Sequence, residues 1–479
     1  MLFNSAIFLF VFLPAVLFGY HHLQRAGRFE WALHYLLLAS LVFYAWWNPI
    51  YLALIIGSMV VNYQLGEALR RQRKRWLLTL GVAFNLILIA IFKYAGFFAQ
   101  SLNTLGADLP VPELVLPLAI SFFTFQQIAY LVEAWRGTAD SAPPLRYALF
   151  VVFFPQLIAG PIVHYNEMVP QFSQAETRRT TTDVMFAQGL FLITAGLFKK
   201  LIIADYLATW ADPVFANACQ ALFFDAWVGA LAYTFQLYFD FSGYSEMAMG
   251  LALLFGFRLP KNFDSPYRAL NIADFWRRWH ITLGRFLRNY LYIPLGGSRH
   301  GLPRTVMTLI VTMLLGGLWH GAGWTFVAWG GLHGLYLAIH YVWRQLPLPL
   351  RLPPAAAWLV TFLSVMVGWV LFRADSLADA KQLLVTLSGI NGLHFPESLT
   401  AVLPENLPII TFAPTSLTVG LEPLLLVVLT VFVATQPNVH ELWQARVRPN
   451  LRWALGTAGL ASVAVSQLSK QSVFLYFQF

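Results

Sequence analysis

The chain has 479 residues, of which 58% are hydrophobic, 16% are aromatic and only 11% are charged. This composition excludes an ordinary soluble globular protein and indicates an all-α, polytopic membrane protein. The net charge of +9 arises from few acidic residues and from arginines grouped in particular stretches, which is typical of cytoplasmic loops rather than of a nucleic-acid-binding surface.

The first apolar stretch, residues 3–20, is interpreted as a retained helix because it lacks a basic segment before it and a small-residue cleavage site after it. The loop between the third and fourth stretches carries Arg70, Arg71, Arg73, Lys74 and Arg75. The positive-inside rule makes that loop cytoplasmic, which places the N-terminus outside. We expect about twelve transmembrane helices, at residues 3–20, 31–47, 50–66, 76–95, 115–132, 185–204, 226–255, 305–320, 322–342, 358–372, 421–435 and 453–469.

Residues 147–163 are apolar but contain Pro155 and a Gly-Pro pair. If this stretch crossed the membrane, Arg178 and Arg179 would face outward and every later loop would invert its charge bias. We therefore expect a re-entrant segment with both ends cytoplasmic. Irregular backbone at that depth must be buried in protein or line a cavity.

Charge is concentrated between residues 258 and 304, a stretch that contains nine Lys or Arg residues and two acidic residues. At about 100° per residue, residues 272–290 form one continuous helix whose aromatic and aliphatic side chains share a face. This pattern predicts an interfacial helix, with the basic face toward headgroups or an anionic ligand and with His280 near the border of the two faces. The basic face consists of Arg277, Arg278, Arg285 and Arg288.

His320 follows an uncharged run, residues 306–318, and lies in Trp319-His320-Gly321. A helix over 305–320 rises about 22 Å, which places this imidazole well inside the membrane. An ionisable group at that depth is a candidate functional residue. A neutral imidazole there can take a proton from a hydroxyl group. The alternative is a histidine that forms a hydrogen bond between helices.

Two other histidines need separate interpretations. His280 either orients a substrate or lies at the interface among the arginines. His333, in Trp329-Gly-Gly-Leu-His, is interpreted as a packing residue. Trp279 and Trp319, which precede His280 and His320 directly, are candidate substrate-binding residues together with the four arginines.

Several chemistries lack support. The chain has no Gly-x-Ser-x-Gly turn, no His-Glu-x-x-His motif and no phosphate-binding glycine loop, so serine hydrolysis, zinc proteolysis and nucleotide hydrolysis are not indicated. The single cysteine, Cys219, excludes an intrachain disulfide and a cysteine-based metal site. We expect no metal and no bound cofactor. A transporter remains possible on composition alone.

Five spaced motifs resemble those of the membrane-bound O-acyltransferases. They are FPQLIAGPIV at 154–163, NFDSPY at 262–267, DFWRRWH at 274–280, YLYIPLGG at 290–297 and GLWHG at 317–321. Within that family the chain is most similar to the bacterial alginate O-acetyltransferase branch, whose members also tend to open like MLFNS and to close like YFQF, found here at 1–5 and 476–479. The resemblance covers nearly the whole chain.

The resemblance implies a funnel-like core of helices, read here as a single domain, residues 1–479, with its catalytic core at roughly 115–345. It implies an essential histidine at His320 and a second one at His280. It also implies transfer of an acyl group from a cytoplasmic donor, acetyl-CoA, toward an exported polysaccharide such as alginate, with a periplasmic partner protein. Location in the bacterial inner membrane, in contact with lipids and without nucleic acid, follows.

Two positions depart from the family pattern. An acidic residue is common where Asn289 stands, and an arginine where His164 stands, so a role of either position in donor binding or topology is open. Two alternatives to acetyl transfer also remain. One is a related acyltransferase that moves D-alanine to teichoic acid, and the other is a transporter or export channel.

Overall fold

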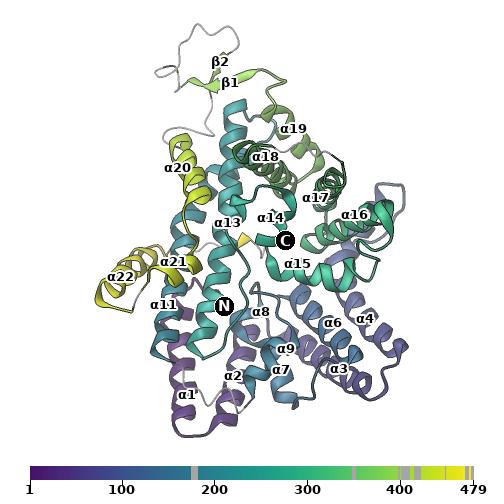
Figure 1. The fold of residues 1–479 in the computed structure, drawn as a ribbon, viewed down its shortest axis with the longest axis vertical. Coiled ribbons are helices and arrows are strands. Elements are labelled where there is room, and N and C mark those ends of the chain that lie inside the picture. The colour runs from purple at the N-terminus through teal and green to yellow at the C-terminus, as the bar shows by residue number, and fades with distance from the viewer. Residues whose placement is uncertain are drawn as a thin grey trace. The chain divides into compact units, whose positions relative to one another are not determined.

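The structure is a computed structural model that describes residues 1–173, 182–347, 352–397, 400, 410–414, 422–447, 449–469 and 474–475. Arg178, Arg179 and the closing motif at 476–479 lie outside the described residues. The described chain is almost entirely helical (Figure 1) and forms two compact units. Unit 1 comprises the described residues within Met1–Phe198, Gly243–Asn262 and 446–475, and unit 2 comprises those within Lys199–Ser242 and Phe263–Ala445.

Unit 1 contains the N-terminal helices and one helix from the C-terminal region. Most residues of these helices are apolar, and the helical conformation satisfies the hydrogen bonds of the backbone without water. In chain order they are η1 (Phe8–Phe12), α1 (Leu13–Arg25), α2 (Phe29–Ala45), α3 (Ile50–Gln72), α4 (Arg75–Ile89), η2 (Ala90–Tyr94), α5 (Ala95–Asn103), α6 (Ile120–Arg136), α7 (Pro144–Val152), α8 (Phe154–Leu157), α9 (Tyr165–Met168), η3 (Val169–Phe172), α11 (Asp183–Phe198) and α22 (Leu451–Ser466).

The stretch predicted to be re-entrant is broken into the short helices α7, α8 and α9. Pro155 lies in the first turn of α8, where a missing N–H costs least. All residues from 149 to 165 are buried, so the irregular backbone is covered by protein, as expected for this segment. That both of its ends face the cytoplasm stays a prediction.

Unit 2 contains the remaining helices and a two-stranded parallel sheet whose register pairs Leu393 with Ile410. Helix α13 (Phe223–Leu254) begins in unit 2 and continues into unit 1 from Gly243. The other elements are η4 (Lys199–Ala204), α12 (Asp205–Ala216), η5 (Pro266–Arg268), α14 (Ile272–Arg278), α15 (Ile281–Leu287), η6 (Arg288–Tyr292), α16 (Gly301–His320), α17 (Trp324–Trp343), α18 (Pro354–Arg373), α19 (Leu377–Leu387), β1 (Leu393–Pro396), β2 (Ile410–Ala413), α20 (Glu422–Thr435) and α21 (Val439–Ala445).

A helix overlaps each of the twelve predicted spans, although only some helices are long and apolar enough to cross a membrane on that ground alone. Among the described residues these are α3, α16, α18 and the continuous run Arg75–Asn103. A fifth candidate is the pair α20 and α21, which is bent by 52°. The structure therefore agrees with a helical membrane protein, and the number twelve stays a prediction.

Helices α16 and α17 pack closely along each other through glycines (Figure 1). A Cβ atom added at Gly317 would lie 2.2 Å from the carbonyl oxygen of Phe326, and one added at Gly330 would lie 2.3 Å from that of Met313. Neither position has room for a side chain, because the obstacle in each case is backbone. These two glycines set the short distance between the two helices.

A buried ion network joins η4, α12 and α13 within unit 2. The Nζ atom of Lys200, which is 2% exposed, lies 2.8 Å from Asp205 Oδ1 and 2.7 Å from Asp240 Oδ1. Asp240 is 1% exposed. Buried charges of this kind persist only when they are paired, since an isolated charge in a low-dielectric interior is costly.

Candidate active site

His320 is the last residue of α16, and Gly321 follows it in an extended conformation that ends the helix. The side chain is 7% exposed. Its ring centroid lies 5.1 Å from that of Trp329, 5.3 Å from that of Phe372 and 4.9 Å from that of Trp319. The uncharged run before His320 thus ends in a buried imidazole enclosed by aromatic rings.

His280 does not lie within a continuous helix, so the prediction of one helix over 272–290 is wrong. Helix α14 ends at Arg278 and α15 begins at Ile281, because His280 adopts a left-handed conformation with φ 44° and ψ 54°. This turn moves the side chain from the expected border of the two faces into the interior, where it is 0% exposed. The side chain therefore lies in the protein interior and not on the exposed surface with Arg277 and Arg288.

The left-handed turn brings His280 beside His320. The two ring centroids are 6.5 Å apart, and His280 also contacts Phe241 at 4.8 Å and Trp319 at 6.1 Å. Burial lowers the pKa of His280 to about 3. The imidazole is therefore neutral at physiological pH.

A second ring of aromatic residues surrounds the histidine pair. Trp279 is 3% exposed and contacts Trp369 at 4.9 Å and Phe263 at 5.0 Å between ring centroids. Trp319 is 4% exposed. Both predicted substrate-binding tryptophans are thus buried in the same region of unit 2 as the two histidines.

His333 lies in this aromatic region too, which agrees with its interpretation as a packing residue. It is 0% exposed, and its Nδ1 atom accepts a hydrogen bond from Trp276 Nε1 at 3.3 Å. Its ring centroid is 5.0 Å from that of Trp329, which also contacts His320. The sequence did not predict the contact of Trp276 with His333, because the helical projection placed Trp276 on a face with several other aromatic residues and did not distinguish it from them.

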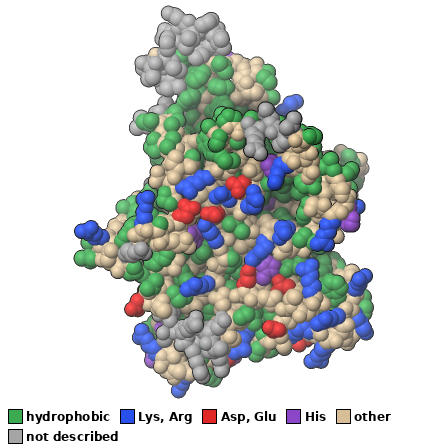
Figure 2. Space-filling model, in the orientation of Figure 1, with side chains coloured by type: hydrophobic (Ala, Val, Ile, Leu, Met, Phe, Trp, Pro, Cys, Tyr) green, Lys and Arg blue, Asp and Glu red, His purple; other side chains and the backbone are tan. Residues whose placement is uncertain are grey.

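The four arginines differ in their surroundings. The side chain of Arg277 is 71% exposed, and Arg288 is exposed as well. Both Arg277 and Arg278 pair with Asp274, Arg277 weakly at 3.7 Å from Nη2 to Oδ1, and Arg278 through a hydrogen bond of 2.9 Å from Nε to Oδ2. Arg285 is half-buried. Figure 2 shows Lys and Arg side chains gathered over the region of α14 and α15, with acidic side chains among them.

The two positions that depart from the family pattern are both ordered. In unit 1, His164 Nδ1 lies 2.8 Å from Glu133 Oε1, and both side chains are buried. In unit 2, Asn289 is half-buried on η6. An imidazole paired with a carboxylate at position 164 supplies an interaction that an arginine would also supply.

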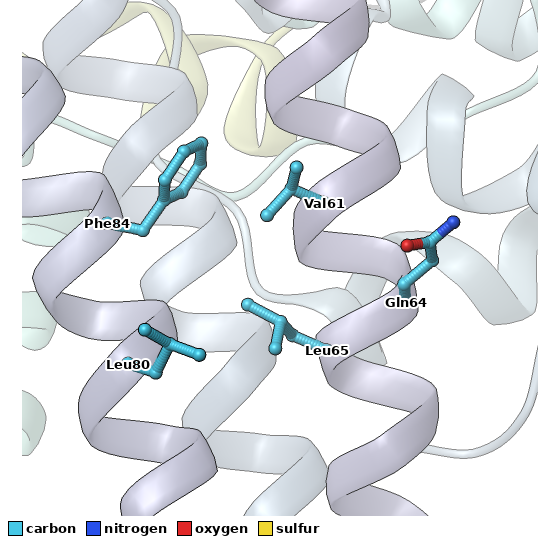
Figure 3. Close-up of a pocket in the computed structure, with 5 residues that line it drawn as sticks. All are labelled: Val61, Gln64, Leu65, Leu80 and Phe84. Carbon is cyan, nitrogen blue, oxygen red and sulfur yellow. The ribbon is translucent and has the colours of Figure 1, made fainter.

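The described residues include no cluster suited to a metal ion, and one apolar groove lies away from the predicted site residues. The described parts of the chain hold no group of three or more His, Cys, Asp or Glu side chains suited to a metal ion. An open apolar groove of 310 Å³ lies between α3 and α4 in unit 1 (Figure 3). It is lined by Val61, Gln64, Leu65, Leu80 and Phe84, none of which has the chemistry of acyl transfer.

Comparison with known proteins gives the family. The sequence model of the membrane-bound O-acyltransferase family matches residues 6–374. The chain is 41% identical to a peptidoglycan O-acetyltransferase of Helicobacter pylori, over 100% of this chain and 98% of the relative. It is 47% identical to a probable alginate O-acetylase of Azotobacter vinelandii, over 81% of this chain and 78% of the relative.

A teichoic acid D-alanyltransferase of Bacillus subtilis is more distant, at 27% identity over 55% of this chain and 70% of the relative. The family match extends over most of the chain and includes both histidines of the buried pair. The chain belongs to the membrane-bound O-acyltransferase family and is an acyltransferase.

Proposed function

We propose that this enzyme transfers an acetyl group from acetyl-CoA, bound at the cytoplasmic surface, to hydroxyl groups of an exported polysaccharide in the bacterial inner membrane. The observation that carries the proposal is the pair of buried imidazoles, His280 and His320, whose ring centroids are 6.5 Å apart inside an aromatic enclosure. A water-poor site with a neutral base suits acyl transfer to an alcohol, because water would otherwise compete as the acceptor.

In this mechanism His320 is the general base. Its imidazole takes the proton of the acceptor hydroxyl as the oxygen attacks the thioester carbonyl carbon. The resulting tetrahedral intermediate collapses, the carbon–sulfur bond breaks, and the thiolate of CoA receives the proton from the imidazolium. His280 is neutral and orients the reacting groups by hydrogen bonding, while Trp279 and Trp319 form the walls that exclude water.

The donor is proposed to bind through the basic side chains of α14, α15 and η6. Arg277 and Arg288 are exposed and can contact the phosphates of CoA directly. Arg278 is already paired with Asp274, and Arg285 is half-buried, so these two contribute mainly to the local fold. Headgroups of lipids are the alternative partners of the exposed pair.

The acceptor is an exported polysaccharide in this proposal, and two kinds of relative suggest which one. Alginate is favoured by the relatives at 44–47% identity, which align over about 80% of this chain. Peptidoglycan is favoured by the relative that aligns over the full chain. A periplasmic acetyltransferase is proposed as the partner that completes delivery to either polymer. D-alanyl transfer is the alternative reaction, at lower similarity.

The test uses purified enzyme in liposomes with labelled acetyl-CoA and either a soluble alginate fragment or a peptidoglycan fragment. We expect CoA release that depends on an acceptor. His320→Gln should accumulate normally but lose at least about 10²-fold in rate, since glutamine forms hydrogen bonds but cannot accept the proton. His300→Gln, an exposed position at the other end of the same helix, is the matched control.

An active and normally accumulated His320→Gln enzyme would contradict the general-base role and move it to His280. Transport of an acyl group or glycan without release of CoA would contradict acyl transfer from acetyl-CoA. Labelling from D-alanine but not from acetyl-CoA would favour the alternative reaction.

A further inference from the structure

Asn438 forms hydrogen bonds in two directions at the start of α21. Its side-chain Oδ1 accepts from the backbone N–H groups of His440 at 3.1 Å and of Glu441 at 3.0 Å, which caps the helix. Its Nδ2 donates to Asp264 Oδ1 and to Ser265 Oγ, each at 3.0 Å. One amide thus connects α21 to the loop that precedes α14, and all of these residues belong to unit 2.

A second contact supports the same connection. Arg268 donates from Nη2 to the carbonyl oxygens of Thr435, at 2.8 Å, and of Gln436. Its Nη1 atom lies 3.3 Å from Glu441 Oε2. The loop 264–268 is therefore held against the bend between α20 and α21 at both of its ends, by a neutral amide and by an arginine.

The same loop is hydrogen-bonded to the residue that ends α14. The N–H of Asp264 donates to the carbonyl oxygen of Arg278 at 2.9 Å, and Arg278 Nη1 donates back to the carbonyl oxygen of Asp264 at 3.2 Å. Arg278 lies two residues before His280. Phe263, directly before the loop, packs against Trp279 at 5.0 Å between ring centroids.

The left-handed conformation of His280 needs such support. A histidine with φ 44° is in a region that non-glycine residues seldom occupy, and it persists only where the surrounding structure fixes it. On its C-terminal side the carbonyl oxygen of His280 accepts the N–H of Gly284 at 3.0 Å. On its N-terminal side the described hydrogen bonds lead from Arg278 through Asp264 to Asn438.

We propose that Asn438 is a positioning residue of the acyl-transfer site, which holds the loop 264–268 so that His280 keeps its left-handed turn beside His320. The inference rests on the proposed function and adds a residue to it. Asn438 lies beyond residues 6–374, where the match to the family model ends. The C-terminal part of this chain thereby takes part in setting the geometry of the family's shared core.

The side-chain amide of Asn438 both accepts and donates hydrogen bonds, so the test variant should remove only the donors. Asn438→Asp keeps the oxygen that caps α21 but loses both donors and places a carboxylate against Asp264. We expect kcat for acetyl transfer to fall about 10- to 100-fold, the range expected when a reacting group is displaced by about 1 Å. The KM for acetyl-CoA should change less than kcat, because the exposed Arg288 lies on η6, beyond the segment that Asn438 positions.

A reciprocal exchange tests whether the hydrogen bond itself matters. When Asp264→Asn is added to Asn438→Asp, the amide at position 264 can donate to the carboxylate at position 438, so the bond is restored with its polarity reversed. We expect kcat of the double variant to exceed that of Asn438→Asp alone. If the single variant has the wild-type kcat, or if the double variant stays as slow as the single one, the inference is overturned.

A readout without catalysis separates this inference from the proposed function. Hydrogen exchange of residues 262–284 should be faster in Asn438→Asp than in the wild type, while α16 and α17 should exchange at unchanged rates. Unchanged exchange at 262–284 would overturn the inference alone, whereas a wild-type enzyme without acetyl transfer would overturn the proposed function. If Asn438→Asp does not accumulate, Asn438→Ser keeps a capping oxygen on a shorter side chain and is measured in the same way.

Discussion

The glycine contact between α16 and α17 offers a sharp test of how closely the site depends on helix packing. In Gly317→Ala the new methyl group would start 2.2 Å from the carbonyl oxygen of Phe326 and about 3.0 Å from the backbone of Gly330. Ordinary van der Waals contact begins at about 3.4 Å, so the two helices must separate by about 1 Å. Backbone atoms on both sides leave no flexible side chain to move instead.

Separation of the helices affects stability and rate by different amounts. Overpacking of this kind costs about 1–3 kcal/mol of folding free energy. His320 lies on α16 and its neighbour Trp329 on α17, with 5.1 Å between their ring centroids. A displacement of about 1 Å between them should lower kcat for acyl transfer about 10²-fold.

The assay pairs the thermal unfolding midpoint in detergent with the rate of CoA release. Gly316→Ala is the matched control, because a Cβ atom there would meet only Leu287 Cδ1, at 3.2 Å, the end of a flexible side chain. We expect the Gly316→Ala enzyme to keep most of its activity and stability. Equal effects of the two substitutions, or a Gly317→Ala enzyme with the wild-type rate, would refute the argument from helix separation.

Two further predictions concern buried ionisable groups. Asp240→Asn should destabilise the protein by about 3–5 kcal/mol, because the buried Lys200 loses the charge of one of its two carboxylate partners, Asp205 and Asp240. The measurement is the unfolding midpoint, and a shift no larger than that of an exposed substitution such as Asp375→Asn would contradict it. His280 has a pKa of about 3 in the folded protein, so between pH 6.5 and 3 its proton binds only to the unfolded state. The free energy of unfolding therefore decreases by about 1.4 kcal/mol for each unit by which the pH is lowered in this range. Stability profiles of the wild type and His280→Asn over pH 7 to 5 should therefore differ in slope, and parallel profiles would count against a buried neutral imidazole.

Hydropathy and charge were enough to predict twelve apolar segments that each overlap a helix, and to predict that His320 is buried. An uncharged run that ends in Trp-His-Gly has few alternatives in an apolar chain, and the helix does end at His320. The break in residues 147–163 could be predicted because proline and glycine interrupt a helix for local reasons.

The position of His280 could not be predicted, because projection at 100° per residue assumes an unbroken helix. No glycine or proline marks the turn between Arg278 and Ile281. The turn is flanked by Arg278, which is hydrogen-bonded to Asp264 across 14 residues of sequence, a contact that helical periodicity does not reveal. Asn438 was missed because two of its partners, Asp264 and Ser265, are more than 170 residues away in the sequence.

The turn at His280 also limits which substitutions can report on chemistry at this position. Side chains branched at Cβ are strongly disfavoured in left-handed backbone, whereas glycine and asparagine adopt it at little cost. In a saturation library at this position, compatibility with the left-handed backbone would decide which variants keep the turn, and the chemistry of the side chain would then distinguish the activity of those variants. Glycine and asparagine variants isolate the loss of the imidazole from the loss of the turn, and asparagine offers a short mutational route by which the site could exchange an imidazole for an amide without rebuilding its main chain.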